Sequence, residues 1–178
     1  MPPKGSAVKD HHKPPDVAAA VSVSDAYESL LRRLPRPVLY GAIQLTSPEA
    51  ILALVPPEMV AGKVVQSKFH VTTIFLHNGV CPDKAMMVRL GELLGTSIQL
   101  TLTQVVSDPK GTAIVVRNEG EFPCANARPH ITVANARGVP AKYSNELLNA
   151  SHAKDRNRSV VNLPAGTCVT GEFAFVFK

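Results

Sequence analysis

The sequence lacks the features that attach a protein to a membrane. No apolar run approaches the roughly 20 residues that a transmembrane helix requires. The N-terminal stretch MPPKGSAVKDHHKPPD contains charge and proline where a secretory signal would have an apolar core. The C-terminal stretch EFAFVFK has no cysteine at the fourth position from the end, where prenylation would need one. We therefore expect a protein with no membrane partner.

Cysteine is also scarce. Only Cys81, Cys124 and Cys168 are present, an odd number without the paired spacing of a disulfide framework or a zinc knuckle. This pattern is typical of proteins in a reducing compartment. We expect a cytoplasmic protein, with the nucleus as an alternative location.

The remaining composition is that of one globular domain. The chain has 178 residues, of which 45% are hydrophobic, and its mean hydropathy is +0.06, so a substantial core is expected. Residues 1–22 are rich in proline, lysine and alanine, and we expect a flexible tail there, followed by a domain at 23–178. The net charge of +5 favours a polyanionic partner such as RNA. We expect this domain to act as a monomer.

Strands and helices alternate along the domain without a regular βαβ repeat. Stretches of β-branched and aromatic residues predict strands, while helical spacing, capping residues and prolines predict helices. The turn Asp-Pro-Lys-Gly at 108–111 predicts a hairpin. The expected strands are 38–45, 68–76, 97–107, 112–118, 128–134, 159–163 and 167–177, and the expected helices are 24–34, 47–55, 82–95 and 143–150. This order predicts an α+β fold with an antiparallel or mixed sheet.

The most informative feature is a duplicated His-x-Thr motif. It begins at His70 and again at His130, each time within a stretch that predicts a strand. Because residues i and i+2 of a strand project to the same face, each motif places an imidazole beside the hydroxyl of Thr72 or Thr132. One such motif is typical of an ordinary strand histidine. Two copies on nearby strands would bring four polar side chains to one cleft.

Such a cleft suits acid/base cleavage of a cyclic phosphodiester. A neutral imidazole accepts a proton from the attacking water, and a protonated imidazole delivers one to the leaving oxygen. Histidine serves in both roles because its ordinary pKa is about 6.5. The threonine hydroxyls donate to phosphate oxygens, where charge accumulates. Only Glu119 and Glu121 lie near a motif, so we expect no metal ion and no other cofactor.

Several segments resemble the 2H phosphoesterase superfamily, and within it the catalytic domain of the myelin-type 2′,3′-cyclic-nucleotide 3′-phosphodiesterases. These segments are LYGAIQL (39–45), FHVTTIFLHNG (69–79), TQVVSDPKGTAIVVR (103–117) and ARPHITVANA (127–136). The resemblance implies a bilobal fold with two antiparallel or mixed sheets around a central cleft and helices outside. It also implies metal-independent hydrolysis of the 2′,3′-cyclic phosphate on nucleotides or RNA 3′ ends to give 2′-phosphates. The superfamily includes the phosphodiesterase domains of RNA-repair ligases, so tRNA is among the expected partners.

The same resemblance assigns roles to individual residues. Phe75 matches an aromatic residue that stacks on the base, although simple strand alternation places it on the face opposite His70 unless the strand bends. Arg128 matches an arginine of the substrate pocket, and alternation places it beside His130. Tyr40 joins this substrate-binding group, with a structural role as the alternative. The resemblance implies that His130 activates water and that His70 protonates the leaving O3′.

Three other interpretations remain open. An enzyme of the same superfamily could cleave 2′,5′-linked oligoadenylate, or act as an RNA 2′,5′ ligase. A non-catalytic RNA-binding module could retain the cleft, in which case binding would survive His70→Ala. A purely structural interpretation predicts that His70 and His130 are buried and far apart.

Overall fold

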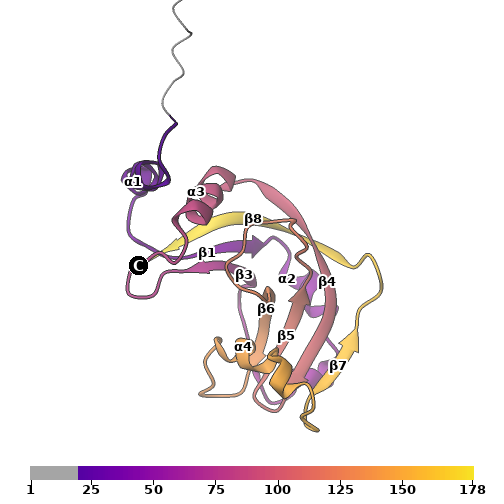
Figure 1. Cartoon of the computed structure of the whole chain (residues 1–178). Coiled ribbons are helices and arrows are strands. Elements are labelled where there is room, and N and C mark those ends of the chain that lie inside the picture. The colour runs from indigo at the N-terminus through magenta and orange to yellow at the C-terminus, as the bar shows by residue number, and fades with distance from the viewer. Residues whose placement is uncertain (1–19) are drawn as a thin grey trace, which may run out of the picture.

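The computed structural model describes residues 20–178, which form an α+β domain. Of the tail expected at 1–22, residues 1–19 lie outside the described residues. Helices flank the strands (Figure 1), and none of those within 20–178 is long and apolar enough to cross a bilayer. The helices are α1 (Val23–Arg33), α2 (Pro48–Leu52), η1 (Pro57–Met59), α3 (Lys84–Leu93), α4 (Tyr143–Leu147) and η2 (Ala150–His152), where η denotes a 3-10 helix.

The first three α-helices begin at side-chain caps. The side chains of Ser22, Ser47 and Asp83 each accept a hydrogen bond from the backbone N–H three residues later, which satisfies a donor that the helix itself leaves unpaired. Helix α1 packs on α3 at Gly91, where a Cβ atom would lie 2.6 Å from Leu30 Cδ1. A larger residue at position 91 would force the Leu30 side chain to move, so the close approach of the two helices favours glycine there.

All the strands pair in antiparallel orientation. Every strand that the sequence predicts is confirmed, and β2 is an additional strand too short to produce an alternating pattern. The strands are β1 (Val38–Leu45), β2 (Val64–Val65), β3 (His70–Phe75), β4 (Ser97–Asp108), β5 (Gly111–Val116), β6 (His130–Asn135), β7 (Ser159–Asn162) and β8 (Cys168–Phe177). The predicted hairpin joins β4 to β5, and Asp108 Oδ1 accepts from the N–H groups of Lys110 and Gly111 in its turn.

The expectation of two separate sheets needs correction, because the strands within 20–178 form one sheet. Its order is β2-β6-β3-β1-β8-β4-β5, and β5 also pairs with β6, so six strands close into a ring. Strand β4 is long enough to pair with different strands along its length. Its first part, 97–101, pairs with β8, while 102–108 pairs with β5 and, in part, with β7.

The ring nevertheless has two lobes (Figure 1). The first lobe contains β1, β3 and β8 with α1 and α3, and the second contains β2, β5, β6 and β7 with α4; β4 runs through both. One large apolar cluster connects the strands of the two lobes. A smaller cluster lies beneath α4 and consists of Val106, Ala113, Tyr143, Leu147 and Leu148. Helix α4 is thereby fixed against β4 and β5, next to the second motif strand.

Candidate active site

The two His-x-Thr motifs lie on neighbouring antiparallel strands. Val71 of β3 is directly opposite Ile131 of β6, and both side chains are completely buried. In antiparallel pairing, the residue before one partner lies across from the residue after the other. His70 and His130 therefore each lie across from the threonine of the other motif. Alternation along the strands sends all four polar side chains to the face opposite this buried pair.

Both motif strands contain a β-bulge at the third residue after the histidine. The register of β3 with β1 leaves Thr73 without an opposite residue, and the register of β6 with β5 leaves Val133 in the same situation. The two bulges are held in the same way. The carbonyl oxygen of Thr73 accepts from Ala125 N at 2.6 Å, and that of Val133 accepts from Gln66 N at 2.9 Å. Beyond each bulge the alternation of side chains reverses.

The bulge in β3 brings Phe75 to the side of His70. Phe75 lies opposite Tyr40 in the register and remains 40% exposed. The Tyr40 ring stacks on the His70 ring with centroids 5.4 Å apart and on the Phe75 ring at 6.2 Å. The His77 ring is tilted against Phe75 at 4.8 Å. We call these four rings the aromatic shelf. Simple alternation places Phe75 on the opposite face, and the bulge provides the bend that brings it to the side of His70.

Glycine is required beside this bulge. A Cβ atom on Gly41 would lie 2.7 Å from Thr73 Oγ1 and 3.1 Å from Ile74 Cγ2. The Thr73 hydroxyl is buried, and its oxygen has no hydrogen-bond partner in the part of the chain that the structure describes. The bulge therefore leaves this buried hydroxyl without a hydrogen bond, at a cost in stability.

The two histidines have different surroundings. Nδ1 of His130 lies 2.8 Å from the carbonyl oxygen of Arg128. Burial lowers the pKa of His130, and the hydrogen bond to this carbonyl opposes the shift. Burial also lowers the pKa of His70, and the nearby charge of protonated His130 lowers it further. The two imidazoles lie on paired strands and line the same cleft.

The second motif threonine is held by α4. Thr132 Oγ1 lies 2.9 Å from the hydroxyl oxygen of Ser144 and 3.5 Å from the carbonyl oxygen of Ala141. Ser144 is almost completely buried. The Ser144 hydroxyl therefore restricts the orientation of the Thr132 hydroxyl.

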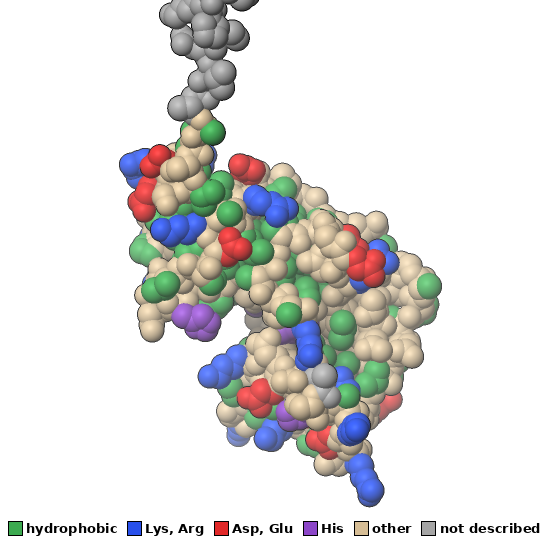
Figure 2. All heavy atoms as spheres, viewed as in Figure 1, with side chains coloured by type: hydrophobic (Ala, Val, Ile, Leu, Met, Phe, Trp, Pro, Cys, Tyr) green, Lys and Arg blue, Asp and Glu red, His purple; other side chains and the backbone are tan. Residues whose placement is uncertain are grey.

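The four motif side chains and the aromatic shelf line one cleft of about 600 Å³, within the range of small-molecule sites. Figure 2 shows the surface hollowed between the two lobes. Lys68 and Lys142 add positive charge to the lining, and among the described residues no carboxylate contributes to it. The cleft is therefore suited to an anion with an aromatic group.

Of the residues expected from the sequence, the structure brings together the two motifs, Tyr40 and Phe75, but it places Arg128 elsewhere. Arg128 does not line this cleft, and its Nη1 donates to the carbonyl oxygen of Leu148 at 2.6 Å. Strand β6 begins only at His130, and Arg128 lies in the preceding turn, where its N–H donates to Asn126 Oδ1. Strand alternation therefore does not extend back to residue 128.

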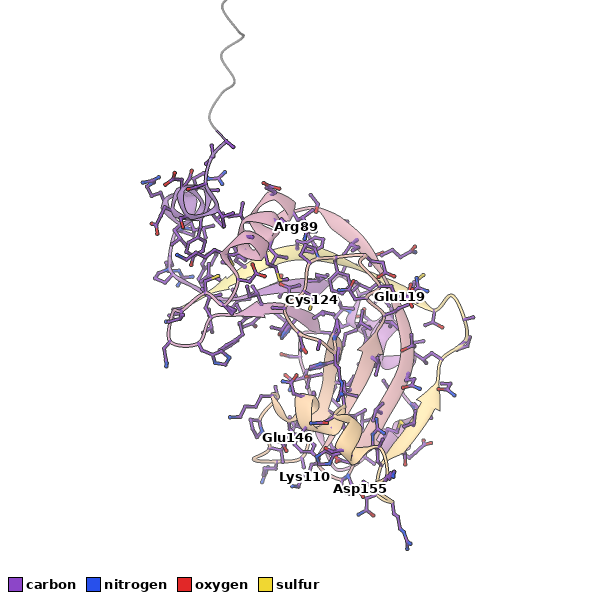
Figure 3. The ribbon with its side chains drawn as sticks, viewed as in Figure 1. Arg89, Lys110, Glu119, Cys124, Glu146 and Asp155 are labelled. Atoms are coloured by element: carbon purple, nitrogen blue, oxygen red, sulfur yellow. The ribbon has the colours of Figure 1, made fainter. Side chains whose placement is uncertain are left out.

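Three residues at the site could not be identified from the sequence. Lys68 and Lys142 line the cleft but lie outside the motifs, and Ser144 contacts Thr132 without lining the cleft. Only the packing of the loops and α4 brings them there. Cys124, labelled in Figure 3, donates from Sγ to the carbonyl oxygen of Thr72 at 3.6 Å, and burial raises the pKa of its thiol. Within 20–178, no group of three or more histidine, cysteine or acidic side chains is positioned to hold a metal ion.

Comparisons with known proteins agree with this fold. A crystal structure of a fungal RNA kinase is similar to 82% of this chain, with a TM-score of 0.59 and 17% sequence identity. The chain covers 46% of that structure's length. A search of the curated proteins gave no match.

The sequence itself matches a family over most of its length. The matched residues, 42–176, extend from β1 to β8 and include both His-x-Thr motifs. The resemblance to the 2H phosphoesterase superfamily is thereby confirmed, and the chain belongs to the family of fungal tRNA ligase phosphodiesterase domains.

Proposed function

We propose that this domain hydrolyses the 2′,3′-cyclic phosphate at an RNA 3′ end or on a nucleotide and leaves a 2′-phosphate. One observation carries the proposal: His70 and His130 line a single cleft, each across from the threonine of the other motif. This arrangement provides an acid, a base and two hydroxyl donors for one phosphate. Membership of a tRNA ligase phosphodiesterase family supports this reaction and favours RNA ends, including those of tRNA.

In this proposal His130 is the base. A carbonyl oxygen only accepts hydrogen bonds, so Nδ1 of His130 carries the hydrogen that it donates to Arg128. Neutral His130 then has its lone pair on Nε2, where it accepts a proton from the attacking water. The orientation is fixed before substrate binds, which favours catalysis.

His70 is the corresponding acid. The water oxygen bonds to phosphorus while the bond from phosphorus to O3′ breaks, and His70 gives its proton to O3′. The product has a 2′-phosphate and a 3′-hydroxyl, and the two histidines have exchanged protonation states. Burial and His130 both lower the pKa of His70, and the negative charge of a bound phosphate opposes that shift.

The neighbouring groups bind and position the substrate. Thr72 and Thr132 donate to the non-bridging phosphate oxygens, where negative charge increases in the transition state. Phe75 and Tyr40 provide a surface on which the terminal base stacks. The mechanism uses no metal ion. The proposed working unit is a monomer formed by residues 23–178, acting in the cytoplasm or the nucleus.

The test is incubation with 2′,3′-cyclic AMP in EDTA, followed by identification of the product. We expect 2′-AMP. Formation of 3′-AMP would contradict the assignment of O3′ as the leaving group, and absence of any product would contradict the enzymatic function. A 2′,5′-linked adenosine dinucleotide is the comparison substrate, and faster turnover of it would assign the cleft to 2′,5′ bonds.

A further inference from the structure

A second pocket lies beside the proposed active site. Its volume is about 270 Å³, which is smaller than a typical drug-sized site of roughly 300–1,000 Å³. The turn before β6 separates the two cavities and contributes to both. Ala125, Asn126 and His130 line the cleft, whereas Ala127 and Arg128 line the second pocket. A ligand chain that leaves the cleft across this turn would reach the second pocket.

Two arginines dominate the chemistry of this pocket. The hydrogen bond from Arg128 Nη1 to Leu148 fixes one guanidinium group, and within residues 20–178 its other donors have no partner. Nε of Arg158 is buried and has no hydrogen-bond partner among the same residues. A buried donor of a charged group without a partner is costly, so its retention calls for an explanation.

Within the described part of the chain, no carboxylate forms an ion pair with these arginines. Among residues 20–178 the single ion pair joins Arg117 to Glu121, and no acidic residue lines the pocket. Asp155 is near Arg158 in sequence, but its Oδ1 accepts from Asn157 N. Figure 3 labels the carboxylates Glu119, Glu146 and Asp155, none of which is a lining residue.

The other polar side chains of the pocket are already engaged. Gln104 Nε2 donates to Asn162 Oδ1 at 3.0 Å. Asn118 donates to the carbonyl oxygen of Phe122 and accepts from two backbone N–H groups. The free donors in the pocket therefore belong mainly to Arg128 and Arg158, whose planar guanidinium groups match the oxygens of a phosphate.

We propose that the pocket binds a phosphodiester of the RNA backbone adjacent to the terminal cyclic phosphate. The inference rests on the proposed function, because it extends the path of the same substrate. It makes the domain selective for the end of an RNA chain over a mononucleotide, since a mononucleotide has no second phosphate to occupy the pocket. Arg128 is thus a substrate-binding residue at the second pocket, outside the cleft.

The test compares equilibrium binding of two product analogues that are not turned over. One is an adenosine trinucleotide with a terminal 2′-phosphate, and the other is 2′-AMP. We expect the wild-type protein to bind the trinucleotide more tightly. We expect Arg158→Gln to weaken trinucleotide binding by at least about tenfold, because hydrogen bonds to a charged group are lost. Binding of 2′-AMP should stay within about twofold.

The matched control is Arg156→Gln, which removes the same charge from an exposed position outside both cavities. It should leave the preference for the trinucleotide unchanged. Arg158→Lys keeps the charge but lacks the planar guanidinium group, so it should give an intermediate loss of trinucleotide affinity. Thermal melting of each variant checks that the fold is intact.

An unchanged trinucleotide preference in folded Arg158→Gln would overturn the inference. If that variant also loses binding of inorganic phosphate, the pocket is a site for a free anion. Failure of the proposed function is detected separately, because it would appear as no turnover of 2′,3′-cyclic AMP by the wild-type protein, whatever the binding results.

Discussion

Val71 of β3 lies directly opposite Ile131 of β6, and this buried pair sets the geometry of the site. A shift of either strand by one residue would turn its histidine and threonine into the core and its apolar residue into the cleft. The cost of burying an imidazole and a hydroxyl in that way keeps the register unique. The proposed catalytic face therefore depends on the apolar residue at the centre of each motif.

Phe75→Ala tests the aromatic shelf. Removing the ring deletes the proposed stacking partner of the terminal base, so KM for 2′,3′-cyclic AMP should rise about tenfold, within the range measured for base–aromatic stacking. The value of kcat should change little, because in the proposed mechanism the ring binds the base and takes no part in proton transfer. Steady-state kinetics checks both values. Phe75→Tyr keeps a ring and should resemble the wild type. An unchanged KM in Phe75→Ala would show that the terminal base does not stack on Phe75.

Gly41→Ala tests the bulge that positions Phe75. The added Cβ atom would overlap with Thr73 Oγ1, so the free energy of unfolding should fall by about 1–3 kcal/mol, as for other overpacked sites. Urea denaturation measures the change. In Gly41→Ala combined with Thr73→Ala the overlapping oxygen is absent, and the two effects should be less than additive. Strict additivity would show that this contact does not determine the cost.

The sequence predicts the part of the site that precedes the bulge in β3, but not the part that follows it. The two motifs, the strands that contain them and the α+β class follow from local patterns of apolar and polar residues. The side on which Phe75 emerges does not, because it depends on the register between β3 and β1, which are distant in sequence. Arg128 was misplaced for a related reason: alternation holds only inside a strand, and β6 begins two residues later.

The remaining differences between the structure and the predictions from the sequence arise from contacts between residues that are distant in the sequence. Nothing near Ser144 identifies it as a neighbour of Thr132, since the packing of α4 on β4 and β5 brings them together. The joining of both lobes in one sheet likewise depends on β4 exchanging partners along its length. Nothing in the sequence of this 12-residue strand indicates that its pairing partner changes from β8 to β5.

Ser144→Ala tests the positioning of Thr132. Without the Ser144 hydroxyl, Thr132 retains only the carbonyl oxygen of Ala141 as a neighbouring acceptor, which draws its proton away from the phosphate. We expect kcat to fall about tenfold with little change in KM, since the lost interaction acts in the transition state. Steady-state kinetics separates the two constants.

Ser151→Ala, an exposed substitution outside the cleft, is the control for this prediction and should leave both constants unchanged. A rise in KM at constant kcat in Ser144→Ala would show instead that Ser144 affects ground-state binding. An equal loss in the two serine variants would contradict a specific role for Ser144.

The lowered pKa values of His70 and His130 predict that acid destabilises the fold. In the unfolded chain these side chains have a pKa of about 6.5, so they bind protons more readily than in the folded protein. Stability is therefore complete above that pKa and falls as the pH drops below it towards the folded-state values. The melting temperature should be lower at about pH 5.5 than at about pH 7.5.

The variant His70→Gln/His130→Gln should reduce this dependence on pH, because the two buried imidazoles no longer titrate. His152→Gln, which lies outside the cleft, should preserve it. Melting curves of the three proteins across the same pH range provide the comparison. A double variant with the full wild-type dependence would place the acid sensitivity in other groups.

The turnover of 2′,3′-cyclic AMP by His70→Ala, His130→Ala and the double variant tests whether the two histidines act as a catalytic pair. Each single variant should lose at least about 100-fold in kcat, as expected for removal of a general acid or base. The double variant should lose far less than the product of the two factors, because both groups act on one phosphate in one step. Turnover close to that of the wild type in either single variant, or fully multiplicative losses in the double variant, would contradict paired-histidine catalysis.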